Sequence, residues 1–176
     1  MGGYGDNNAW QIVNLGAGIF ATGAFWNNYY FIATPQNGLA AYQLNPATAK
    51  LTSTPVSASS SPSGGFPWPG SSPAISSSGS TNGIAWAIDS SRYCTNKSSA
   101  CGSAVVHAYN ATNLANELWN SSMAAGGADA AGNAVKFTVP TVANGKLYVG
   151  TRGNNTGGAY GSTSVSGELD VYGLKP

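Results

Sequence analysis

The feature that most constrains this chain is an apolar segment that occurs three times with a tyrosine at the same place. The copies are GLAAYQL at 38–44, VVHAYNA at 105–111 and ELDVYGL at 168–174. Their shared tyrosines are Tyr42, Tyr109 and Tyr172. The segments ATGAFWN, SSPAISS and TVPTVAN, which precede these copies, also align with one another. Such a repeat predicts similar structural units, each of which needs a neighbour to cover its apolar faces.

Strand-like runs separated by turn signals fill each repeat unit. We expect strands at 19–26, 29–34, 38–44 and 51–57, then at 73–77, 83–88, 104–111 and 117–121, and finally at 137–143, 146–151 and 168–174. Without the polar insertions at 89–103 and 152–167, a unit approaches the ~40–50 residues of a propeller blade. The sequence therefore predicts an all-β fold of about three antiparallel meanders, which form a single partial β-propeller domain over residues 1–176.

The composition excludes several classes of function. Charged residues make up 7% of the chain, against ~25% in an average domain. The few lysines and arginines are scattered and the formal net charge is +1, so we expect no nucleic-acid partner. Six acidic residues are too few for a carboxylate-rich metal cage. No apolar run reaches the ~18 residues of a membrane-spanning helix.

Several motifs carry a resemblance to a known family. The third unit contains PTVANGKLYVGTRG followed by GELDVYGL, and the other segments are TNGIAWAID, HAYNATNL and the opening MGGYG. In these segments the chain resembles the carboxy-terminal part of secreted proteins with quinoprotein-type (PQQ-like) repeat β-propellers. The resemblance implies propeller blades and a secreted or periplasmic location. PQQ is not predicted, because no residue of this chain matches the quinone-contacting residues of the family one by one.

Cys94 and Cys101 lie close together in the Ser-rich segment YCTNKSSAC. This spacing predicts a disulfide that closes a loop, with two free thiols as the alternative. A zinc site would need more ligands, because His107 is the only histidine. The opening MGGYGDNNAW has neither the basic nor the apolar region of a signal peptide, so we expect no leader in this chain. A disulfide and a weakly charged surface favour an extracytoplasmic compartment.

Three ionisable residues are candidates for acid–base chemistry: Asp129, Asp89 and His107. The two aspartates flank loops, where such a pair could act on a sugar or bind calcium together with backbone carbonyls. His107 could be a general base. The alternatives are turn capping by the aspartates and a half-buried strand position for the histidine. No cofactor and no metal-ligand set are predicted.

Aromatic residues supply the candidate ligand site. Phe66 and Trp68 lie in the loop motif FPWP, where an exposed tryptophan suggests a binding surface. Together with Trp26 they could form a stacking surface for a carbohydrate or another small ligand. The alternative is that the loop folds back and buries them.

The leading functional hypothesis is a non-enzymatic, extracytoplasmic binding module. The alternative is a hydrolase that acts on a sugar or lactone, and a third hypothesis is a fragment of a quinoprotein dehydrogenase. About three blades cannot close a ring, since propellers have about four to eight. We also expect a strand without a partner at Ala9–Leu15, which could pair with the third unit of a second copy. The sequence therefore predicts a two-fold symmetric homodimer that completes the ring.

Overall fold

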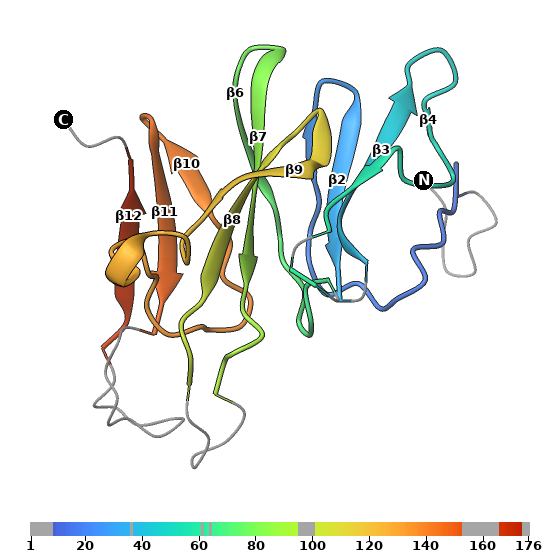
Figure 1. Ribbon diagram of the computed structural model, residues 1–176. Coiled ribbons are helices and arrows are strands. Elements are labelled where there is room, and N and C mark those ends of the chain that lie inside the picture. The colour runs from blue at the N-terminus through green and yellow to red at the C-terminus, as the bar shows by residue number, and fades with distance from the viewer. Residues whose placement is uncertain are drawn as a thin grey trace.

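The described residues of the chain form three antiparallel sheets, none of which closes on itself. The computed structural model describes residues 9–35, 37–60, 62–63, 65–94, 101–152 and 166–173. Apart from one short 3-10 turn at Ala125–Gly127, the regular structure in these ranges is all strand, which confirms the predicted all-β class. Figure 1 shows the sheets side by side in chain order. No helix in this part of the chain could cross a membrane.

Each sheet is a meander whose strands follow chain order. The first contains β1 (Ala24–Trp26), β2 (Tyr29–Thr34), β3 (Gly38–Asn45) and β4 (Lys50–Leu51), and β5 (Ser57–Ala58) pairs with β3. The second contains β6 (Ala74–Ser78), β7 (Thr81–Asp89), β8 (Val105–Asn110) and β9 (Asn113–Asn120). The third contains β10 (Thr141–Ala143), β11 (Lys146–Thr151) and β12 (Glu168–Tyr172).

Three expected strands are clearly shorter than the sequence predicts, and the one at 137–143 is reduced to β10. The expected strand at 19–26 is reduced to β1, because the Thr22 N–H donates to Ser72 Oγ at 3.1 Å instead of joining a ladder. The expected strand at 51–57 is divided between β4 and β5. Pro55 lies between them and has no N–H to contribute to a ladder.

The pairs Asn27-Asn28 and Asn144-Gly145 between strand-like runs predict tight hairpins, and both hairpins are present. Asn27 and Asn28 join β1 to β2 with φ of 48° and 63°. Asn144 and Gly145 join β10 to β11 with φ of 50° and 68°. Positive φ at both central residues defines the type I′ turn, whose twist matches that of the flanking strands. The chemistry of these residues therefore fixes the register of both hairpins.

The core lies between the sheets, because successive residues of a strand face opposite sides. On β8, Tyr109 packs with Phe31 and Leu39 between the first and second sheets. Its neighbour on the other face, Val106, packs with Leu147 between the second and third sheets. The middle sheet is thus covered on both faces, as the stacking of repeat units predicts.

The repeated tyrosines occupy corresponding faces of their sheets. Tyr109 faces the first sheet, and Tyr172 faces the second sheet beside the residues that pack between sheets two and three. Tyr42 packs with Ile32 and Ala40 on the outer face of the first sheet, where no preceding sheet lies. The alignment of the three sequence repeats therefore matches structurally equivalent positions in the three sheets.

The expectation of a strand at Ala9–Leu15 is wrong. This segment is not a strand and crosses the outer face of its own first sheet. The Gln11 side chain donates to the Leu51 carbonyl at 2.7 Å and accepts from the Leu51 N–H at 2.8 Å. Val13 and Leu15 pack against the Tyr42 cluster. Alternating burial is present, but it covers an apolar sheet face instead of extending a sheet edge.

Candidate functional site

The first strands of the three sheets lie beside one another, since β6 contacts both β1 and β10. The segments that lead into these strands therefore meet at one edge of the stack. Trp26 on β1 closes the gap between the first two sheets: its ring lies over Gly83, where a side chain would collide with it, and its Nε1–H donates to the Gly79 carbonyl at 2.8 Å. The predicted ligand residue Trp26 thus has a packing role.

The two aromatic residues of the FPWP loop have different environments. Phe66 is 1% exposed and packs in the core between the first and second sheets, so the loop does fold back at this position. Trp68 is 41% exposed. Phe66 and Trp26 thus belong to the same core cluster between the first two sheets, and Trp68 is the accessible ring of the three.

Trp68 belongs to a cluster of exposed aromatic rings, which we call the aromatic edge and which consists of Phe20, Trp68 and Phe137. Its ring centroid is 4.2 Å from that of Phe20 and 6.3 Å from that of Phe137, both in edge-to-face geometry. Phe20 and Phe137 are 54% and 63% exposed. Each of the three residues precedes the first strand of its own sheet, so every repeat unit contributes one ring.

Two of the three rings of this cluster share a sequence motif. FATGA at 20–24 and FTVPT at 137–141 place a phenylalanine at the same distance from β1 and from β10. The motif alone does not reveal that the rings meet, because their contact depends on how the sheets stack.

A pocket of about 360 Å³ adjoins the aromatic edge. Its walls include Phe20, Phe137 and the hydroxyl-bearing side chains of Thr22, Ser72 and Thr138. No charged side chain is among the residues that line it. The chemistry that this pocket offers to a ligand is thus apolar ring surface together with neutral hydroxyl groups.

The three acid–base candidates lie in separate environments. Asp89 Oδ1 accepts the Ser91 N–H at 2.8 Å, which is the turn-capping alternative. Asp129 lines a cavity between the second and third sheets. His107 is buried on the opposite side of the second sheet, next to Phe66. In the part of the chain that the structure describes, no hydrogen bond or ion pair joins any two of the three.

His107 has a carboxylate partner that the sequence did not indicate. Its Nδ1–H donates to Glu117 Oε1 at 2.6 Å, and Asn120 Nδ2 donates to the same oxygen at 3.1 Å. The imidazole stacks on Tyr109 with 5.8 Å between ring centroids. Nε2 is buried and has no hydrogen-bond partner among the described residues. The histidine therefore lies in the core between two sheets, away from the pocket at the aromatic edge.

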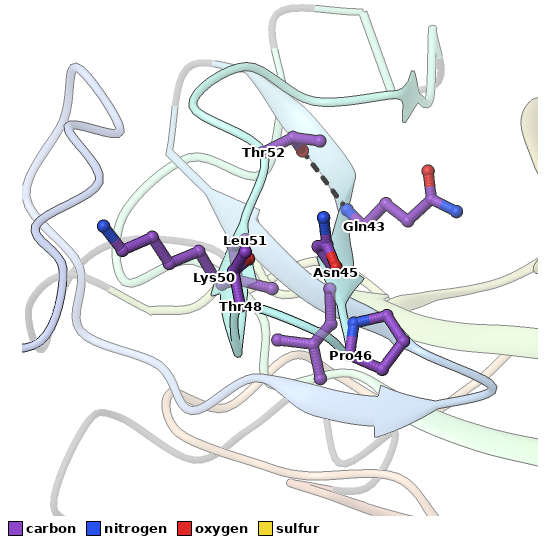
Figure 2. Close-up of a pocket in the computed structure, with 8 residues that line it drawn as sticks. Gln43, Asn45, Pro46, Thr48, Lys50, Leu51 and Thr52 are labelled. Atoms are coloured by element: carbon purple, nitrogen blue, oxygen red, sulfur yellow. Dashed lines mark hydrogen bonds between the residues drawn. The ribbon is translucent and has the colours of Figure 1, made fainter.

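A further pocket of about 480 Å³ lies at the turn between β3 and β4 (Figure 2). Gln43 N–H donates to Thr52 Oγ1 at 3.2 Å, and Asn45 Oδ1 accepts the Ala47 N–H at 2.9 Å. Figure 2 shows the side chains of Gln43 and Lys50 pointing away from each other. The polar groups of this pocket thus stabilise the turn and do not converge on a common point.

The disulfide between Cys94 and Cys101 is present, as predicted. Arg152 Nη1 donates to Cys94 Sγ at 2.7 Å and joins the end of the third sheet to this bridge. No group of three or more His, Cys, Asp or Glu residues that could hold a metal ion occurs among the residues described. Neither a family model nor a curated protein nor a solved structure matches this chain.

Proposed function

We propose that this protein is a non-enzymatic, extracytoplasmic binding module of the propeller type, which binds a neutral carbohydrate at the aromatic edge. One observation carries the proposal: the segment before the first strand of each sheet presents an exposed aromatic ring, and the Trp68 ring contacts the other two. Exposed aromatic clusters are unfavourable in water and commonly mark binding surfaces. The disulfide and the scarcity of charge support an extracytoplasmic location.

A carbohydrate fits the chemistry of the pocket beside this edge, whose lining residues carry no charge, while the ammonium group of Lys136 lies 6.0 Å from the centroid of the Trp68 ring. The apolar C–H face of a pyranose stacks on aromatic rings, and its hydroxyl groups need neutral hydrogen-bonding partners. Phe20, Trp68 and Phe137 supply the rings, and Thr22 and Ser72 supply hydroxyl groups beside them. A site of this kind takes a ligand with few charges.

Stacked blades and association with a second copy through the third sheet are part of the proposal. The outer face of the third sheet exposes Leu169 and Val171, although the corresponding residues of the first sheet, Leu39 and Ala41, are buried under the next sheet. This open face supports a homodimer. The covered first sheet argues against exchange of Ala9–Leu15 as its basis.

The experiment is a calorimetric screen of the protein against neutral oligosaccharides. We expect binding that Trp68→Ala weakens by about two- to tenfold, because an aromatic contact contributes about 0.5–1.5 kcal/mol. Trp10→Ala is the matched control, because Trp10 is an exposed tryptophan on the amino-terminal segment. Lack of binding to any neutral glycan, or equal loss in both variants, would contradict the proposal. Release of reducing sugar would instead favour the hydrolase hypothesis.

A further inference from the structure

A second cavity, chemically different from the aromatic edge, lies between the second and third sheets. Its volume is about 450 Å³, and its lining residues come from strands of both sheets. Three aromatic side chains, Trp86, Trp119 and Tyr172, line it together with aliphatic residues. Asp129 and Lys146 are its charged lining residues.

Strand register explains the tryptophans on one wall. Trp86 on β7 is paired with Ala108 on β8, and Ala108 is paired with Trp119 on β9. The three residues therefore form a row across one face of the sheet, and the small alanine leaves room between two large rings. The Trp86 Nε1–H donates to Ser76 Oγ at 2.8 Å, which fixes the orientation of that ring.

The opposite wall comes from the third sheet. The Tyr172 ring on β12 meets Trp119 edge-to-face, with 5.5 Å between centroids and 64° between ring planes. The rings of Trp119 and Tyr172 thus meet at an angle, and the Trp86 ring lies at the other end of the row, beyond Ala108. Such an arrangement presents ring surface to a ligand from more than one direction.

Three carboxylates lie close enough to Tyr172, a lining residue of this cavity, to affect its ionisation. The chain has six acidic residues, and Asp129, Glu168 and Asp170 all act on Tyr172. Burial, followed by these three carboxylates, raises the pKa of Tyr172 to about 12. Asp170 is engaged by the Gly132 N–H at 2.9 Å, so Asp129 is the carboxylate that lines the cavity. Lys146 is exposed on the hairpin that follows Gly145 and supplies one opposing charge.

We propose that this cavity binds an organic cation, specifically a trimethylammonium group. Tryptophan and tyrosine faces attract cations through the ring quadrupole, and quaternary ammonium groups are recognised by surrounding aromatic rings. The carboxylate of Asp129 adds attraction without requiring an N–H donor on the ligand. A free choline-type molecule and a choline lipid headgroup share this chemistry.

The direct test compares choline with its neutral isostere, 3,3-dimethylbutan-1-ol, by isothermal titration calorimetry. The two molecules have nearly the same shape and differ in charge. We expect choline to bind about tenfold more tightly than the alcohol, because the attraction is to the charge. Equal affinities, or no binding of choline, would overturn the proposal.

Variants assign the binding to this cavity. Asp129→Asn removes the charge at constant size and is expected to weaken choline binding about fivefold. Asp89→Asn is the matched control, because Asp89 is another aspartate at the edge of a loop and lies outside the cavity lining. Lys146→Gln removes the opposing charge and is expected to tighten binding. Unchanged affinity in both Asp129→Asn and Lys146→Gln would refute the assignment. Lys146 is exposed and Asp129 is half-buried, and Asp129→Asn keeps the size of the side chain, so we expect both variants to fold.

A final experiment distinguishes the two possible sources of the trimethylammonium group, a free molecule and a lipid headgroup. Sedimentation with phosphatidylcholine vesicles, with phosphatidylglycerol vesicles as control, tests whether the headgroup at a membrane surface is accessible to the cavity. Choline binding with selective sedimentation on phosphatidylcholine assigns a lipid headgroup. Choline binding without sedimentation assigns a soluble ligand.

Discussion

At the scale of single residues, the contact between Trp26 and Gly83 joins the first two sheets. Gly83 lies on a strand directly under Trp26. The absence of a side chain leaves room for the tryptophan, because a Cβ on residue 83 would collide with the six-membered ring of Trp26. In the sequence this glycine is the third residue of β7 and offers no sign of such a contact. The requirement for glycine at this position follows from the contact between the two sheets and not from the local sequence.

Gly83→Ala is therefore expected to lower the free energy of unfolding by about 1–3 kcal/mol, as overpacking does. Denaturant unfolding measures the change. A double-mutant cycle identifies its cause: in a Trp26→Leu background the same glycine substitution should cost much less. An unchanged cost in that background would mean that the strand geometry, and not the tryptophan, requires the glycine.

Tyr172 gives a second prediction at this scale, through pH. Its pKa is raised from 10.0 to about 12, so the folded state holds the phenolic proton more tightly than the unfolded chain. The resulting stabilisation is complete below about pH 10 and is lost between about pH 10 and pH 12. Tyr172→Phe has no such proton, and its stability should fall less steeply over that window in denaturant titrations.

At neutral pH the same substitution has a different expected result. The Tyr172 hydroxyl is buried and lacks a hydrogen-bond partner in the described part of the chain. Its removal should therefore be nearly neutral or slightly stabilising, since no bond is lost. Burial also raises the pKa of Tyr42, so some alkaline destabilisation should remain in the variant. Identical alkaline slopes in the variant and the parent protein would refute the assignment to Tyr172.

At the scale of elements, the sequence was sufficient to predict the features that depend on local residue type. The type I′ turns at Asn27–Asn28 and Asn144–Gly145 follow from residue type, and the tyrosine repeat gave the stacking register. The sequence did not predict the course of residues 9–15, because the same alternation suits a sheet edge and the cover of a sheet face. It also did not reveal the tryptophan cavity, which depends on two sheets that meet.

The disulfide is the element-scale feature that we expect to contribute most to stability per residue. Cys94 and Cys101 are seven positions apart in sequence, and a closed loop of that size restrains the unfolded chain by about 2–3 kcal/mol in the chain-entropy description. Replacement of both cysteines by serine should lower the unfolding free energy by about that amount. Thiol titration of the denatured, unreduced parent protein should find no free thiol from this pair.

At the scale of the whole molecule, the three sheets are stacked in one direction and the two ends of the stack differ. The amino-terminal segment covers the first sheet through Val13 and Leu15. The last sheet leaves Leu169 63% exposed and Val171 50% exposed on β12. The ends are unequal because the first has a segment of its own to bury its apolar side chains. The third sheet is therefore the end of the stack where burial of exposed apolar side chains by a partner would be favourable.

We expect the third sheet to carry the contact between copies. Leu169→Lys with Val171→Lys places two charges on this apolar face, which disfavours association of exposed strands. Multi-angle light scattering should give a dimer mass for the parent protein and the monomer mass of 17.8 kDa for the double variant. Ile12→Lys is the control, because Ile12 is an exposed apolar residue on the other end of the stack; it should leave the dimer intact. A parent protein that scatters as a monomer at all concentrations would exclude the homodimer, and dissociation by Ile12→Lys alone would move the interface to the first sheet.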